Sequence, residues 1–293
     1  MLTEVIEKYI KQILAEKVQS TISSLRFLSV DGGSINETYK ITINNTRFFF
    51  VKINDAQKFP SLFEKERSGL NFIAEQKIIR TPEVLHSSII SNYQILVLEW
   101  ISQGLKSQTF WNIFGEALAK LHKVTSEDHG FYEMNYIGAL PQTNQYTKNW
   151  IDFFIHQRLQ PQINLAASKG LLFKKHIEGF EKLYPELVNI FEEENASLLH
   201  GDLWRGNFMC DDRGRPVLID PAIYFGHRSM DLAMTTLFSG FDRIFYDSYN
   251  YHFPFPRNYQ EQWDVCNLYP LLIHLNLFGS GYLHDIESVI KKF

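Results

Sequence analysis

The sequence predicts an α+β fold of two lobes, with a five-stranded antiparallel sheet in a small N-terminal lobe and a larger, mainly helical C-terminal lobe. Two observations support this division. Strand-like apolar runs are concentrated before residue 102, whereas apolar residues at helical spacing dominate after it. The polar, glycine-containing stretch 102–106 has the composition of a linker. We therefore expect an N-terminal nucleotide-binding lobe over residues 1–101 and a C-terminal catalytic and acceptor-binding lobe over residues 107–293.

The N-terminal lobe is predicted to begin with a surface helix and to continue with five strands. Apolar residues between Leu2 and Leu14 recur at helical spacing and are interrupted by Glu and Lys, which fits an amphipathic helix and not a signal peptide. Apolar runs bounded by turn residues then predict the strands. The expected strands cover residues 25–30, 37–43, 47–53, 84–90 and 93–101.

A glycine-containing turn lies between the first two predicted strands. Gly32, Gly33 and Ser34 can place backbone N–H groups over phosphates, because glycine permits close approach and unusual dihedral angles. This turn departs from the protein-kinase pattern G-x-G-x-x-G, and an ordinary hairpin turn is the alternative. The three residues are candidate nucleotide-binding residues only in combination with other signals.

Lys52 is the first such signal, because kinases carry on the third strand the Lys that pairs with the α- and β-phosphates. An ordinary edge-strand lysine is the alternative. A helix over residues 62–76 is predicted to follow, with Ser61 as its N-cap and Glu64 completing a capping box. Within this helix we expect Glu66 to pair with Lys52; a solvated helix residue is the alternative.

The seam between the lobes is the expected place for a nucleotide base. Glu99 and Ile101 end the fifth predicted strand just before the linker. Their backbone groups are therefore candidates to hold the base, while apolar side chains pack against it.

The C-terminal lobe is organised around residues 198–207. Phosphoryl transfer to a hydroxyl requires a carboxylate beside the acceptor oxygen and metal ions that neutralise the phosphate charge. Asp202 with Asn207 five residues later matches the kinase catalytic loop H-R-D-x-x-x-x-N, and Asp220 after a short apolar strand matches the metal-binding Asp. Asp202 is therefore the predicted base, and Asn207 and Asp220 are the predicted Mg²⁺ ligands. A polar turn between two strands is the alternative.

Helices are predicted on both sides of this loop. The expected ones cover residues 150–169, with Gly170 as the C-cap, and residues 174–194. The stretch 269–279 is interpreted as aromatic-rich helical packing.

The length of the segment after Asp220 indicates what kind of molecule accepts the phosphate. It is too short for the long activation loop of a protein kinase before the next helix, which favours a small-molecule acceptor. Asp231 is expected to cap that helix and to hydrogen-bond the loop that bears Asp202.

Composition excludes several other classes. The 293 residues are 45% hydrophobic and 21% charged, as in ordinary globular proteins. A formal net charge of −4 without a dense Lys/Arg run argues against a nucleic-acid-binding protein. The isolated Cys210 and Cys266 indicate neither a disulfide framework nor a zinc cluster, so a cytoplasmic location is expected. No apolar run reaches the length of about 18 residues expected of a membrane span.

These motifs together resemble the fructosamine kinase, or ketosamine-3-kinase, family, within the protein-kinase-like fold shared with aminoglycoside phosphotransferases. The similarity extends over nearly the whole chain. The motifs that carry it are Gly32-Gly33-Ser34-Ile35, Phe50-Val51-Lys52, Ile137-Gly138 with Gln142 and Asn144, Trp150 with Phe153-Phe154 and Arg158-Leu159, Leu199-His200-Gly201-Asp202-Leu203-Trp204, Asp220-Pro221-Ala222, Asp231-Leu232-Ala233-Met234 and His274-Leu275-Asn276-Leu277-Phe278-Gly279.

The resemblance implies ATP-dependent phosphorylation of the C3 hydroxyl of a ketosamine, a sugar joined to an amine on free lysine or on a protein. The 3-phosphate makes that adduct unstable, so the implied role is deglycation. By the same resemblance Trp204 lines the sugar pocket, Lys52 and Glu66 set the phosphates of ATP, and Asn207 and Asp220 hold Mg²⁺. A monomer is favoured.

Three residues depart from the family pattern. Ser34 stands where some members carry a Cys that links subunits as a redox switch, so that regulation is not expected. Arg205 stands where a small residue is common, and Ile273 where Asn is common. Both positions bear on the choice of acceptor.

Two other functions remain open from the sequence. One is a phosphotransferase for another small aminated alcohol, such as an aminoglycoside or a choline-like compound. The other is a pseudokinase that binds a nucleotide and acts as a scaffold, although the complete set of Lys52, Asp202, Asn207 and Asp220 speaks against it.

Overall fold

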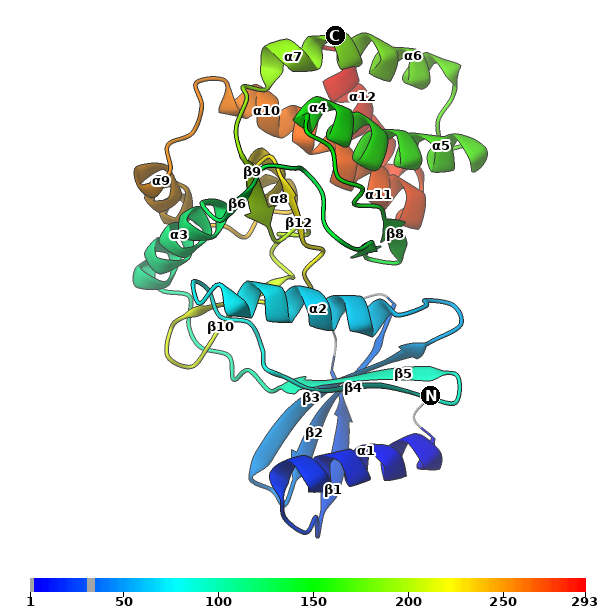
Figure 1. Cartoon of the computed structure of the whole chain (residues 1–293), viewed down its shortest axis with the longest axis vertical. Coiled ribbons are helices and arrows are strands. Elements are labelled where there is room, and N and C mark those ends of the chain that lie inside the picture. The colour runs from blue at the N-terminus through cyan, green and yellow to red at the C-terminus, as the bar shows by residue number, and fades with distance from the viewer. Residues whose placement is uncertain (1–2, 31–34) are drawn as a thin grey trace.

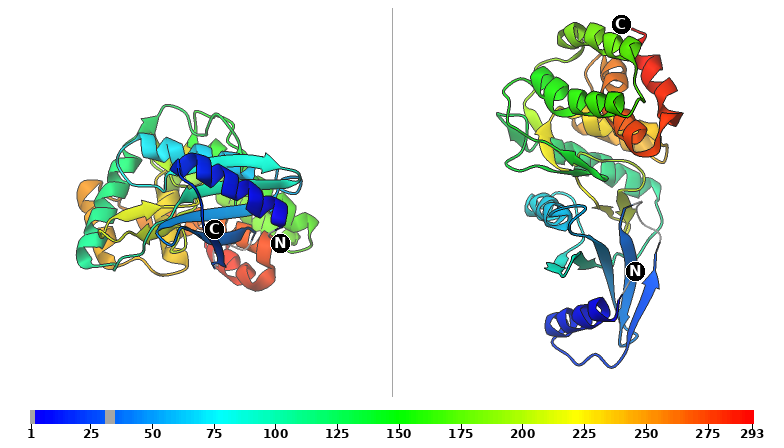
Figure 2. Two further views of the ribbon diagram at one scale, coloured as in Figure 1. Left: turned by 90° about the horizontal axis from the view of Figure 1, so that it is seen from below. Right: turned by 90° about the vertical axis from the view of Figure 1, so that its right-hand side faces the viewer.

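An antiparallel sheet and a helical part lie one beyond the other along the long axis of the molecule (Figures 1 and 2). The structure is a computed structural model in which residues 3–30 and 35–293 are described. The candidate residues Gly32, Gly33 and Ser34 lie outside the described residues.

The sheet has five strands in the order β1-β2-β3-β5-β4, and every neighbouring pair is antiparallel. The expected strands are present, and their ends agree with the prediction to within two residues. The strands are β1 (Leu25–Ser29), β2 (Glu37–Ile43), β3 (Arg47–Asp55), β4 (Val84–Ile90) and β5 (Tyr93–Glu99).

Each face of the sheet is covered by one helix, because side chains alternate between the faces along a strand. The helix α1 (Glu4–Val18) packs on the face that includes Val51 and Val97. The helix α2 (Leu62–Glu75) packs on the opposite face, which includes Leu96 and Leu98. Figure 1 shows α2 between the sheet and the helical part. Lys52, between Val51 and Ile53, therefore points toward α2 and not toward α1.

Helix α2 also contacts the helical part. The Lys65 ammonium lies 2.6 Å from the Glu133 carboxylate. The hydroxyls of Ser68 and Tyr132 are 2.8 Å apart, and Tyr136 donates to the carbonyl of Pro60 at 3.0 Å. The Phe72 and Phe131 rings meet edge to face at 5.2 Å between centroids. These contacts hold the helix that bears Glu66 against both parts of the molecule.

The helical part surrounds short strands that carry the catalytic loop. Residues 102–106 connect it to β5, and the division into lobes at this stretch stays a prediction. Its helices are α3 (Gln108–His122), α4 (Trp150–Phe153), α5 (Gln160–Ser168), α6 (Lys174–Leu183), α7 (Leu187–Ile190), α8 (Ser229–Leu237), α9 (Arg243–His252), α10 (Tyr259–Cys266), α11 (Leu268–Phe278) and α12 (Leu283–Ile290). Its strands are β6 (Thr125–Ser126), β7 (Asn135–Ile137), β8 (Leu140–Gln142), β9 (Ala196–Leu199), β10 (Phe208–Cys210), β11 (Pro216–Leu218) and β12 (Tyr224–Gly226).

Two of the expected helices are interrupted. The expected helix 150–169 consists of α4, a π-helical segment over Phe154–Leu159, and α5. The expected helix 174–194 is α6, a 3₁₀ turn over Tyr184–Glu186 and α7, and it ends at Ile190. The second interruption falls at Pro185, which has no backbone N–H and whose ring clashes with the preceding helical turn.

Two expected helix caps are wrong. Ser61 adopts a φ of 59°, and its side chain makes no capping hydrogen bond, so the expected capping box with Glu64 is absent. Asp231 is the third residue of α8 and lies in its first turn, whereas Arg228 occupies the N-cap position. The carboxylate of Asp231 bonds the catalytic loop instead.

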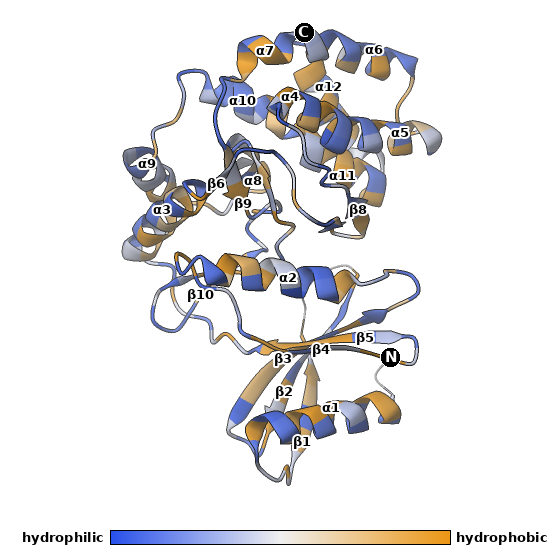
Figure 3. Cartoon of the chain, viewed as in Figure 1, coloured by the Kyte–Doolittle hydropathy of each residue, from blue (hydrophilic) through white to orange (hydrophobic). Residues whose placement is uncertain are grey.

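Hydropathy alternates around most of the outer helices (Figure 3). No helix in the described ranges is long and apolar enough to cross a membrane.

Candidate active site

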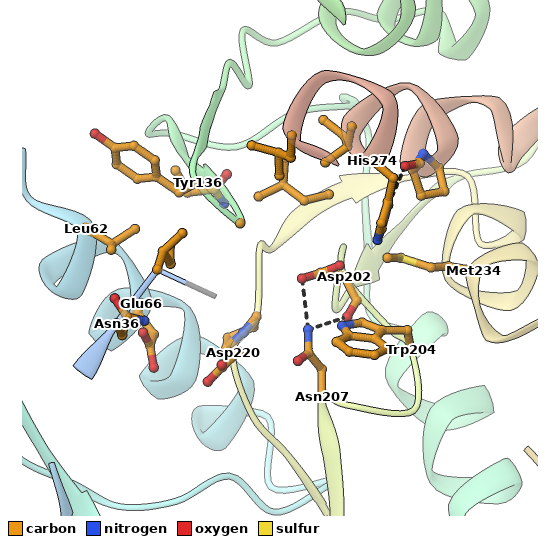
Figure 4. A pocket seen from close by; sticks show the side chains of 18 of the residues that line it. Asn36, Leu62, Glu66, Tyr136, Asp202, Trp204, Asn207, Asp220, Met234 and His274 are labelled. Carbon is orange, nitrogen blue, oxygen red and sulfur yellow. Dashed lines mark hydrogen bonds between the residues drawn. The ribbon is translucent and has the colours of Figure 1, made fainter. Parts of the chain in front are cut away.

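A cavity of about 930 Å³ opens between the sheet and the helical part. Its walls bring together predicted site residues that are far apart in the sequence, and Figure 4 shows several of these side chains around one space. They are Lys52 on β3, Glu66 on α2, Asp202, Trp204 and Asn207 in the loop after β9, and Asp220 after β11.

Asp231 fixes the backbone of the catalytic loop. Its carboxylate accepts the N–H of His200 at 2.7 Å, the N–H of Gly201 at 2.9 Å and Nε2–H of His122 at 3.2 Å. Burial would raise the pKa of Asp231, but the hydrogen bond and charge of His122 outweigh it and hold the pKa below its usual range. The expected hydrogen bond from Asp231 to the loop is therefore present.

His200 joins the loop to the segment that precedes Asp220. Its Nε2–H donates to the carbonyl of Ile219 at 2.9 Å, and its Nδ1 accepts the N–H of Asp202 at 3.2 Å. Burial lowers the pKa of His200, so the ring is neutral and each nitrogen has a fixed role. These two hydrogen bonds hold the backbones of Asp202 and Asp220 in a fixed position relative to each other.

Gly201 is required by the close approach of two backbone segments. It has a φ of 82°, and a Cβ atom at this position would lie 2.0 Å from the carbonyl oxygen of Ala222. A side chain cannot be accommodated without moving the backbone. Asp220 has a φ of 54°, a conformation that Asp adopts more readily than most residues.

Asp202 and Asn207 are joined directly. Nδ2 of Asn207 donates to Oδ2 of Asp202 at 2.8 Å and to its backbone carbonyl at 2.9 Å (Figure 4). This orientation turns the amide nitrogen toward Asp202 and leaves Oδ1 for another partner. Desolvation and the charge of Asp220 raise the pKa of Asp202 to about 7, although the bond from Asn207 opposes the rise. A carboxylate with a pKa near neutrality is suited to general-base catalysis.

Lys52 lies between two carboxylates. Its ammonium is 2.7 Å from Oε1 of Glu66 and also contacts Oδ1 of Asp220. The expected pairing of Lys52 with Glu66 is therefore present. Burial opposes the charge of Lys52, but the two carboxylates outweigh it and raise its pKa. Burial raises the pKa of Glu66 to about 7, and the charge of Asp220 adds to this effect while Lys52 opposes it.

The donor set fits a divalent cation bound together with phosphates. Three carboxylates, of Glu66, Asp202 and Asp220, line the cavity together with the buried ammonium of Lys52. Oδ1 of Asn207 and the half-exposed carboxylate of Asp220 are oxygen donors of the kind that Mg²⁺ takes. Among the described residues no group of three or more His, Cys, Asp or Glu could hold a metal ion.

Two expected nucleotide-binding residues do not line the cavity. The carboxylate of Glu99 contacts Arg80, and the backbone N–H of Glu99 donates to the carbonyl of Glu83 at 2.9 Å. Ile101 is buried. Their contact with a nucleotide base stays a prediction.

Helix α11 supplies a wall of the cavity, although its sequence was interpreted as helical packing and Ile273 alone was expected to bear on the choice of acceptor. Successive turns of one face line the cavity, and the opposite face is buried in the core. The lining residues are Pro270, Ile273, His274, Leu277 and Phe278. Their spacing of three and four residues, with a histidine among them, is the signal that could have identified this face.

The fold and the site define a kinase-like phosphotransferase, because the strand lysine, its helix glutamate, the catalytic-loop Asp and Asn and the second Asp all meet in one cavity. The family model for fructosamine kinase matches residues 6–293. The chain belongs to the fructosamine kinase family and is a phosphotransferase.

Individual relatives agree with this assignment. A Synechocystis protein provisionally named ketoamine kinase is 37% identical over 90% of this chain and 88% of its own. A protein of Oryza sativa subsp. japonica named protein-ribulosamine 3-kinase, chloroplastic, is 35% identical over 90% of this chain and 78% of its own. A crystal structure from Haemophilus somnus, provisionally named fructosamine-3-kinase, has a TM-score of 0.87 and 27% identity, and the match covers 97% of this chain and 96% of the other.

Proposed function

We propose that this kinase transfers the γ-phosphate of ATP, with Mg²⁺, to the C3 hydroxyl of a ketosamine. The observation that carries the proposal is the presence of Asp202, the Lys52–Glu66–Asp220 cluster and the wall supplied by α11 in one cavity. The names of the relatives supply the acceptor class. Phosphorylation at C3 would make the adduct unstable and would serve deglycation.

In the proposed reaction Asp202 accepts the proton of the C3 hydroxyl. The hydroxyl oxygen then forms a bond to the γ-phosphorus, while the bond from that phosphorus to the bridging oxygen breaks and ADP leaves. Lys52, oriented by Glu66, would pair with the α- and β-phosphates. Asn207 and Asp220 would hold Mg²⁺, which neutralises charge on the transferred phosphoryl group when bound.

The charges of the side chains that line the cavity favour a sugar over a polycation as the acceptor. Among the described residues that line the cavity, the acidic side chains are Glu66, Asp202 and Asp220, all of which belong to the proposed catalytic and nucleotide-binding groups. An aminoglycoside carries several ammonium groups and would require further carboxylates for recognition. The wall of α11 is instead apolar and aromatic.

Acceptor profiling tests the proposal. ATP consumption with Mg²⁺ would be measured against ribulose-lysine, erythrulose-lysine, fructose-lysine, an aminoglycoside and choline. We expect turnover of the ketosamines alone, and the Asp202→Asn variant should lose it by orders of magnitude. Turnover of the aminoglycoside or choline alone would contradict the acceptor class. ATP binding without turnover of any compound would favour the scaffold.

A further inference from the structure

A continuous row of aromatic rings leads from the catalytic loop to the surface of the cavity. We call it the aromatic platform; it consists of Trp204, Phe238, His274, Phe278 and Tyr282, all of which line the cavity. The centroid distances are 5.9 Å for Trp204–Phe238, 4.8 Å for Phe238–His274, 5.5 Å for His274–Phe278 and 5.1 Å for His274–Tyr282.

The platform begins beside Asp202 and ends in solvent. Trp204 is two residues after Asp202, and Figure 4 shows the ring of His274 directed toward Asp202 and Met234. At the other end the side chain of Phe278 is 56% exposed. Because Phe278 both lines the cavity and is exposed, its ring can contact a bound ligand and solvent.

The platform carries no charge of its own. Nδ1–H of His274 donates to the carbonyl of Pro270 at 2.7 Å, and burial lowers the pKa of the ring, so His274 is neutral. Arg205 directly follows Trp204 in the sequence, is cationic and also lines the cavity. The side chains that form the platform therefore offer ring faces to a ligand and no carboxylate.

The geometry of phosphoryl transfer determines which part of the acceptor can reach the aromatic platform. The attacking oxygen enters opposite the leaving group, so the acceptor lies on the side of Asp202 that faces away from the nucleotide groups. In a ketosamine the nitrogen is attached at C1, two carbons from the C3 hydroxyl. With that hydroxyl at Asp202, the platform offers the group on the nitrogen a path along Trp204 and His274 toward Phe278.

We infer that the aromatic platform is the binding subsite for the group attached to the ketosamine nitrogen, and that it favours larger apolar or aromatic groups over small ones. This inference rests on the proposed function. Stacking on ring faces and removal of apolar surface from water supply the preference.

The test compares fructosamines made from methylamine, benzylamine and 1,3-diaminopropane, with kcat/KM measured for each. The wild-type protein should prefer the benzylamine adduct to the methylamine adduct by about tenfold, mainly through KM. Phe278→Ala should reduce this ratio to about two. Tyr251→Ala removes an aromatic side chain on α9 that is 83% exposed, and it should leave the ratio unchanged.

A second variant separates selectivity from folding. Phe278→Glu places a carboxylate at the mouth and should raise kcat/KM for the diaminopropane adduct relative to the benzylamine adduct by about tenfold. Equal kcat/KM for the methylamine and benzylamine adducts in the wild-type protein would overturn the platform and leave the ketosamine kinase intact. Failure to phosphorylate any adduct would overturn the proposed function itself.

Discussion

The carboxylate of Asp231 on α8 accepts the backbone N–H of His200 at 2.7 Å, and this bond ties the catalytic loop to a buried helix. Asp231→Asn keeps the size of the side chain but places an NH₂ group against a backbone donor. We expect the free energy of unfolding to fall by about 2–3 kcal/mol and kcat to fall by at least tenfold. Thermal unfolding and steady-state kinetics measure the two effects.

Asp264→Asn is the matched control for this change. The side chain of Asp264 is about half exposed and pairs with Lys292 on the surface, so its replacement should alter stability by less than about 1 kcal/mol. An Asp231→Asn protein with the stability and kcat of this control would contradict the role given to Asp231.

The pair of Lys52 and Glu66 predicts an effect on nucleotide binding. Glu66→Gln removes one of the two carboxylates beside Lys52 and leaves its ammonium paired with Asp220 alone. We expect KM for ATP to rise about tenfold, with little change in melting temperature. Glu64→Gln, at an exposed position of the same helix, should leave KM for ATP at the wild-type value. If both variants kept that value, Lys52 would not need Glu66 for its position.

Gly201 predicts a severe backbone effect. The carbonyl of Ala222 occupies the space that a Cβ atom needs, so Gly201→Ala should separate the segment that carries Asp220 from the loop that carries Asp202. We expect at least a hundredfold loss of kcat and a loss of stability on the order of 2 kcal/mol or more. Gly281→Ala, where no atom lies within 4 Å of the added Cβ, is the control. Wild-type kinetics in Gly201→Ala would show that the loop can relax.

Two buried histidines predict how stability depends on pH. Burial lowers the pKa of His227 and of His129 to about 4, and both rings contact Trp150. In the unfolded chain their pKa returns to about 6.5. Between these values the unfolded state binds more protons, so stability is complete above pH 6.5 and is lost as the pH falls toward 4.

We expect each of these histidines to contribute on the order of 2 kcal/mol to this loss. Urea unfolding at pH 7, 6, 5 and 4 measures it. Replacing His129 and His227 together by Gln should flatten the dependence, whereas His156→Gln, at an exposed position, should not. An unchanged slope in the double variant would assign the acid sensitivity to other groups.

Much of the site follows from short-range patterns. Asp202 and Asn207 are five residues apart in one loop, so the sequence alone shows their spacing. The predicted pairing of Lys52 with Glu66 depended only on the order of one strand and one helix. The strands could be predicted equally well from the sequence, because turn residues flank each apolar run. The roles of these residues in nucleotide and metal binding stay predictions.

Other features depended on tertiary packing. Ser61 has the composition of an N-cap, but its backbone is left-handed and its side chain makes no cap bond. Helix α11 is apolar around most of its circumference, so apart from His274 its sequence did not distinguish the face that meets the cavity from the face that meets the core. The boundary of a cavity is set by what packs around a helix, and a single sequence does not state that arrangement.

The contacts of α2 couple the unfolding of the sheet to the unfolding of the helical part. This helix completes the core on one face of the sheet, and it is also bonded to the helical part through Lys65–Glu133 and Ser68–Tyr132. Neither part can lose its structure without exposing surface that the other part buries through α2. Sheet and helical part are therefore expected to form a single cooperative unit that melts in one transition.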